Sequence, residues 1–158
     1  MVTLYYLRRF LDYFNQLLRN IKISEIKVTS QVHWWFENVR KIITNDSKKH
    51  NAFSDSDRMS YLASLGKIFE KYRDQVRNSD LTKEDSISVE KTKDFITTFC
   101  LHVDETIYLS KSENNLFEAY KTIEIDDKEE TVNVKKLDLM LEGQVAALSS
   151  QVLGTSDI

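Results

Sequence analysis

The feature that most constrains this chain is its lack of turn-forming residues. Its 158 residues contain no proline and only three glycines. Sandwiches, barrels and α/β folds use many tight turns, and those turns rely on glycine and proline. The scarcity therefore favours long helices joined by polar loops, and the length suits one domain with its own core.

Apolar residues recur at helical spacing in five segments, so we expect helices near residues 3–20, 30–44, 57–77, 89–110 and 135–154. Gly66 lies inside the third, where we expect a close helix crossing. Between the last two, "TIEI" and "TVNV" alternate apolar and polar residues, as half-buried strands do. We find no internal repeat. The sequence predicts an all-α fold over residues 1–158: one antiparallel bundle of about five helices, with a small β-hairpin near residues 121–134.

The first and last helices carry more apolar surface than one packing face needs. Along residues 3–20, the two adjoining stripes are Leu4, Leu7, Leu11, Phe14, Leu18 and Ile21, and Tyr6, Phe10, Tyr13 and Leu17. The last helix, "KKLDLMLEGQVAALSSQVLG", is the least charged stretch, and its stripe is Leu137, Leu141, Val145, Leu148 and Val152. Such stripes are buried against several neighbours or mark an interaction site, so we expect a protein partner or self-association.

Charge and composition exclude several classes of protein. The net charge of -3 gives no basic field for nucleic acid, and we expect no nucleic-acid partner. Arg8, Arg9 and Asp12 interrupt the N-terminal apolar run, so we read no secretory signal, and no run is long enough to span a membrane. A single cysteine, Cys100, rules out an internal disulfide framework. We expect a cytoplasmic protein.

The densest aromatic group is Trp34-Trp35-Phe36. Consecutive residues of a helix point in different directions, so the three rings cannot line one flat surface. We expect Trp35 and Phe36 in the core and Trp34 to be the candidate contact for a partner or a sugar.

No established catalytic, metal or cofactor motif is present, and we expect none of these sites. The nearest cluster is His102 with Asp104 and Glu105, since His102 and Glu105 are one helical turn apart. A stand-alone helical enzyme using these two residues is our least favoured alternative. We expect Cys100 to be a buried, inert thiol. One acidic group could be considered for calcium: Asp126, Asp127, Glu129 and Glu130. It lacks the spacing of a calcium loop, so we expect a solvated turn.

Three stretches together resemble a known group of proteins: "YLASLGKIFEKYRDQV" (61–76), "SENNLFEAYKTIEI" (112–125) and "LDLMLEGQVAALSSQVL" (137–153). They are similar to segments of large bacterial carbohydrate-active proteins built on (α/α) toroids and related to glycoside phosphorylases and hydrolases. Residues 115–120 match a stretch that tends to lie on the loop side of the toroid, with Asn115 and Glu118 replacing glycine and histidine. The resemblance implies Phe117 and Tyr120 as candidate sugar or partner contacts.

Two functions follow as hypotheses. The first is a non-catalytic helical structural or interaction module. The alternative is a truncated segment of a carbohydrate-active enzyme of the glycoside phosphorylase or hydrolase type, without activity alone, whose last helix packs against helices outside this chain.

Overall fold

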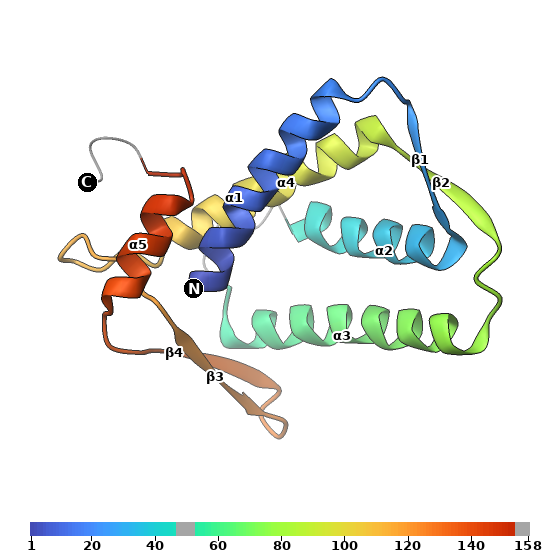
Figure 1. The fold of residues 1–158 in the computed structure, drawn as a ribbon. Coiled ribbons are helices and arrows are strands. Elements are labelled where there is room, and N and C mark those ends of the chain that lie inside the picture. The colour runs from blue at the N-terminus through green and yellow to red at the C-terminus, as the bar shows by residue number, and fades with distance from the viewer. Residues whose placement is uncertain (47–52, 154–158) are drawn as a thin grey trace.

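The computed structural model describes residues 1–46 and 53–153. Over these residues the chain is mostly helical, and the expected five helices are present (Figure 1). Four short strands form two separate antiparallel pairs, so the fold is not purely all-α. The elements are α1 (Val2–Asn20), β1 (Glu25–Thr29), α2 (Ser30–Asp46), α3 (Asp55–Asn78), β2 (Glu84–Ser88), α4 (Val89–Tyr108), β3 (Lys121–Asp126), β4 (Thr131–Lys136) and α5 (Leu141–Ser149).

Serine side chains fix two of the helix starts. Ser54 Oγ accepts a hydrogen bond from the Asp57 amide, and the Asp57 carboxylate accepts one from the Ser54 amide, which makes a capping box for α3. Ser88 Oγ accepts from the Lys91 amide at the start of α4, at 3.3 Å. These caps satisfy amides that a helix start would otherwise leave unpaired.

The sequence did not predict the β1–β2 pair, because residues 21–30 and 78–88 were expected to be connections between helices. The two strands align antiparallel with Lys27 opposite Ser86 at the centre. Each strand runs directly into a helix, and the two junctions are held alike: the Ser30 amide donates to Lys83 O and the Val89 amide to Ser24 O, both at 2.9 Å.

This pairing builds a repeated arrangement from a sequence without a repeat. Each half is a helix, a strand and a helix, and the β1–β2 pair places Lys27 opposite Ser86 where the two halves meet. Accordingly α1 packs on α4, and α3 packs on α2. Phe36 and Phe95, each the seventh residue of its helix, meet edge to face at 5.4 Å between ring centroids. In Figure 1, α2 and α4 both lead away from the β1–β2 ribbon.

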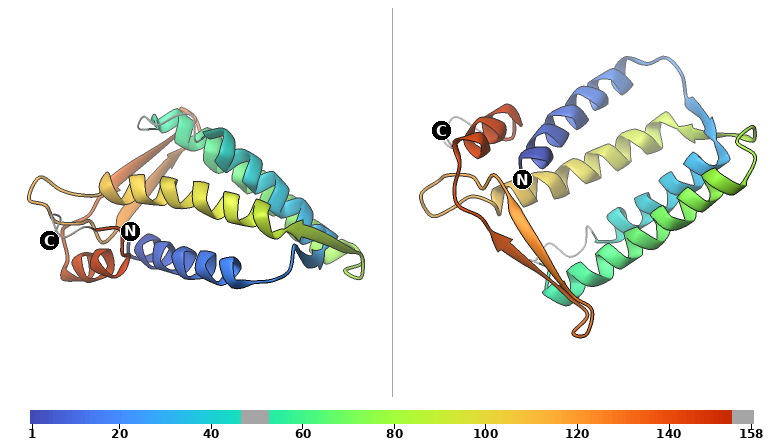
Figure 2. Two further views of the ribbon diagram at one scale, coloured as in Figure 1. Left: turned by 90° about the horizontal axis from the view of Figure 1, so that it is seen from above. Right: turned by 60° about the horizontal axis from the view of Figure 1, so that its bottom comes forward.

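The main core lies between α1, α4 and α5. Its buried members are Tyr5, Leu11, Leu18, Val89, Ile96, Val103, Ile107, Phe117, Ala146 and Ala147. Figure 2 shows α1 and α5 together on one side of α4. By contrast α3 has no buried residue, and its Leu62, Phe69 and Val76 are exposed. A Cβ on Gly66 would meet nothing within 4 Å, so the expected helix crossing there is wrong.

The predicted hairpin is confirmed as β3–β4, with Ile123 opposite Val134 and Ile125 opposite Val132. Val132 is buried and β4 packs against α3. In the acidic turn, Asp126 Oδ1 accepts hydrogen bonds from the amides of Lys128 and Glu129. The last helix is shorter than expected, since α5 begins at Leu141, and the expected end of the helix at residue 154 lies outside the described residues.

Candidate functional site

An exposed apolar stripe runs along one side of α1. It consists of Tyr6, Phe10, Tyr13 and Leu17, which are 48%, 55%, 59% and 43% exposed, and we call it the α1 stripe. The residues are spaced four, three and four apart, so they form one continuous line about 16 Å long at the rise of an α-helix. Of the two stripes predicted for this helix, this is the one left facing solvent.

The other side of α1 holds the helix firmly against the core. Leu11 and Leu18 are buried, and Arg8 makes a two-pronged ion pair with Asp104 of α4, at 2.5 Å from Nε to Oδ1 and 3.2 Å from Nη2 to Oδ2. The hydrogen bond to Asp104 raises the pKa of Arg8. Phe10 of the α1 stripe also stacks on Phe14, at 5.8 Å between centroids. The stripe is therefore presented by a fixed and ordered helix.

A second exposed apolar face lies on α5. Leu141, Val145 and Leu148 are 79%, 54% and 50% exposed, and we call them the α5 stripe. The reason lies on the inner side of this helix, where a Cβ on Gly143 would come within 2.7 Å of Phe117 O. Only small residues fit so close to another backbone, so the large side chains of α5 are directed outward.

A side-chain amide fastens α5 to the segment before the hairpin. Gln144 Oε1 accepts from the Phe117 amide and Gln144 Nε2 donates to Phe117 O, each at 2.8 Å. The Val2 amide donates to Ala119 O at 3.0 Å, so the same segment also contacts the start of α1. Residues 117–119 thus join α1 and α5, the two helices that carry the exposed stripes.

The three predicted contact residues do not form one site. Phe117 is 3% exposed and packs edge to face on Tyr5, so a partner cannot reach it in this conformation. Tyr120 is exposed, and its hydroxyl donates to Glu142 Oε1 at 2.8 Å. Trp34 is half-buried, with Lys71 Nζ 4.9 Å from its ring centroid.

Of the two neighbours of Trp34, Phe36 lies in the core as expected, whereas Trp35 is only half-buried. Phe36 is buried against Phe95 of α4, and Trp35 lies 5.8 Å from Phe69 and 6.0 Å from Tyr72, both on α3. Trp34 is therefore placed at the edge of the contact between α2 and α3, apart from the α1 and α5 helices.

A buried carboxylate lies next to the Phe117 segment. Glu118 is 2% exposed, with Lys136 Nζ at 2.8 Å from Oε1 and Lys121 Nζ at 3.0 Å from Oε2. Burial acts to raise the pKa of Glu118, but the two ammonium groups outweigh it and lower this pKa below its ordinary value. The arrangement ties the hairpin to the core through a charged contact.

The residues considered for chemistry, Cys100, His102 and Glu105, all lie on α4. His102 Nε2 is 3.2 Å from Ile43 O, which ties its ring to the backbone of α2. Burial raises the pKa of the Cys100 thiol, which opposes the thiolate that a nucleophile needs. Over residues 1–46 and 53–153, no group of three or more His, Cys, Asp or Glu side chains is placed to hold a metal ion.

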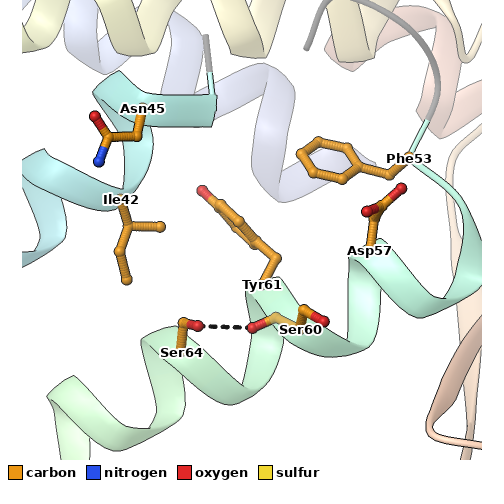
Figure 3. Close-up of a pocket in the computed structure, with 7 residues that line it drawn as sticks. All are labelled: Ile42, Asn45, Phe53, Asp57, Ser60, Tyr61 and Ser64. Carbon is orange, nitrogen blue, oxygen red and sulfur yellow. Dashed lines mark hydrogen bonds between the residues drawn. The ribbon is translucent and has the colours of Figure 1, made fainter. Parts of the chain in front are cut away.

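A small hollow of about 260 Å³ lies between the end of α2 and the start of α3, and Figure 3 shows the side chains that line it. Tyr61 points from α3 toward Ile42 and Asn45 of α2. Much of its polar lining is already engaged: Asp57 belongs to the capping box, and Ser64 Oγ donates to Ser60 O at 2.8 Å. The hollow therefore has few free groups with which to hold a polar ligand.

No protein-family model matches this sequence, and no curated protein matches it significantly. In the part of the chain that the structure describes, every helix is too short or too polar to cross a membrane.

Proposed function

We propose that this chain is a non-catalytic interaction module that associates with a second copy of itself through the α1 stripe. The observation that carries the proposal is the exposure of Tyr6, Phe10, Tyr13 and Leu17 on a helix whose opposite side is fixed to the core. Burying the exposed part of these four side chains stabilises an interface by roughly 25 cal/mol per Å² of apolar surface removed from water. Such contiguous surface is typical of interaction sites.

The spacing of the α1 stripe favours a second copy over an unrelated partner. A two-fold interface requires a surface that is complementary to itself. The intervals of four, three and four residues read the same in both directions, so two α1 helices can pack antiparallel with Tyr6 opposite Leu17 and Phe10 opposite Tyr13. Each aromatic ring then contacts a large apolar side chain of the other copy.

The test compares two arginine variants on the same helix by sedimentation velocity. Phe10→Arg places a charge within the stripe, and we expect it to weaken self-association by about tenfold or more. Gln16→Arg adds the same charge at an exposed position outside the stripe and should leave association unchanged. Equal association of both variants and the wild type would overturn the proposed interface.

A second candidate is a segment of a larger carbohydrate-active protein, supported by one observation. The stretches 112–125 and 137–153, which carry most of the resemblance, lie in contact through Gly143 and Gln144 against Phe117. In this case helices of the larger protein cover the α5 stripe. A reading frame for the rest of a toroid directly downstream of this one would support the candidate, and an unrelated downstream frame would count against it.

A further inference from the structure

A second and larger hollow, of about 560 Å³, lies where four helices and the hairpin meet. This volume falls within the range of about 300–1,000 Å³ that is usual for small-molecule sites. Its lining comes from α1, α2, α3, α4, β3 and β4, together with residues flanking α1, α3 and α4.

The walls of this cavity are mainly apolar. They are formed by Met1, Leu4, Ile43, Phe53, Phe99, Val103, Leu109 and Val134. Phe53 and Tyr61 pack together at 5.7 Å between centroids and line both this cavity and the smaller hollow of Figure 3. An apolar wall of this extent suits the hydrocarbon part of a ligand.

Among the described lining residues, six have polar side chains: Arg58, Tyr61, His102, Glu105, Thr106 and Lys121. Arg58 and Lys121 carry positive charge and Glu105 is acidic, so cations outnumber carboxylates two to one among the described lining residues. Arg58 pairs with Asp55 through Nη1, and Lys121 Nζ lies 3.0 Å from Glu118. A guanidinium has five donor hydrogens and an ammonium has three, so both side chains keep donors for a further anion.

We propose that this cavity binds a small amphipathic carboxylate, such as a medium-chain fatty acid. The hydrocarbon chain lies along the wall formed by Leu4, Phe99 and Val103, and the carboxylate accepts hydrogen bonds from the cationic side chains. Charge-assisted hydrogen bonds to arginine and lysine are stronger than neutral ones, which selects a carboxylate over an alcohol of the same length. This proposal does not depend on self-association through α1.

The experiment is isothermal titration calorimetry of the full chain with decanoate and with decan-1-ol. We expect decanoate to bind the wild type about tenfold more tightly than decan-1-ol. Arg58→Gln should remove most of that preference while leaving decan-1-ol binding unchanged, and Lys121→Gln serves as the second variant if Arg58→Gln unfolds the first turn of α3. Equal affinity of the wild type for the acid and the alcohol, or no binding of either, would overturn the proposal.

Two tryptophan variants on α4 locate the ligand. Thr106 lines the cavity, so Thr106→Trp should fill it and abolish binding of both probes. Thr97 is exposed on the same helix outside the lining, so Thr97→Trp should bind like the wild type. Phe10→Arg should also bind decanoate normally. Loss of binding in Phe10→Arg with retention in Thr106→Trp would place the probe on the α1 stripe and contradict the cavity site.

Discussion

The side-chain amide of Gln144 pairs with the backbone of Phe117 as a neighbouring strand would, with one bond accepted and one donated at 2.8 Å each. Through this pairing a nine-residue helix is fixed to a segment without regular structure. A helix so short has little stability of its own, so its position depends on such contacts.

Replacing Gln144 by leucine should therefore loosen α5. The change leaves the Phe117 amide and carbonyl without their partner, and we expect a loss of about 1–3 kcal/mol in the free energy of unfolding. Urea denaturation followed by circular dichroism measures this. Gln16→Leu on α1 is the matched control, because the Gln16 side chain is exposed and, over the described residues, hydrogen-bonds only to Asp12 of its own helix. There the loss should be under about 0.5 kcal/mol.

Replacement by alanine should change the stability of the fold in opposite directions at the two helical glycines that the structure describes. At Gly143 a new Cβ meets Phe117 O at 2.7 Å and the Ala119 amide nitrogen at 3.0 Å, and such overpacking costs about 1–3 kcal/mol. At Gly66 the space is open, so Gly66→Ala should stabilise α3 by up to about 1 kcal/mol. Melting temperatures of the two variants check this, and a stabilising Gly143→Ala would contradict the close approach of α5.

The ion pairs of Glu118 should give a stability that depends on pH. The pKa of Glu118 in the folded chain is lower than its ordinary value of 4.5, so the folded state holds this proton less tightly than the unfolded state. The contribution is therefore complete above about pH 4.5 and is lost as the pH falls through the lowered pKa.

Urea midpoints of wild type and Glu118→Gln across this range provide the measurement. Above pH 4.5 the urea midpoint of the wild type should be higher than that of Glu118→Gln. Below pH 4.5 the difference between the two midpoints should shrink. Glu129→Gln, in the exposed turn of the hairpin, should show no such trend. A difference that stays constant down to pH 3 would mean that the charge of Glu118 is not what stabilises the fold.

Local patterns predicted the first four helices well because their causes are local, whereas α5 begins six residues later than the expected start at residue 135. The apolar spacing along residues 3–20 and 89–110 marks α1 and the start of α4 within one or two residues. The hairpin was also predictable from the sequence. Apolar and polar residues alternate on both sides of an acidic turn, and this pattern lies within one short stretch of the chain.

The β1–β2 pair was missed because it joins segments far apart in sequence. Ile26 lies opposite Ile87. Neither "EIKVT" nor "EDSIS" carries a turn from which the strand that pairs with it could be predicted. The repeated order of helix, strand and helix was not predicted for the same reason. It repeats backbone hydrogen bonds at Ser30 and Val89, while the side chains at most equivalent positions differ.

The candidate site could be predicted only in part. Helical spacing identified both stripes of α1, but which of them packs on α4 depends on tertiary contacts such as the pairing of Arg8 with Asp104. Burial of Phe117 follows from the approach of Gly143, a contact between segments more than twenty residues apart. The large cavity draws on six elements, so no stretch of sequence could indicate it.

Sedimentation equilibrium of the wild-type chain, from low to high micromolar concentration, tests the central claim most directly. The account predicts that the measured mass rises from the monomer value of 18.6 kDa toward about 37 kDa, because two α1 stripes cover each other. A mass that stays at 18.6 kDa throughout, for a folded chain, would show that Tyr6, Phe10, Tyr13 and Leu17 do not mediate self-association.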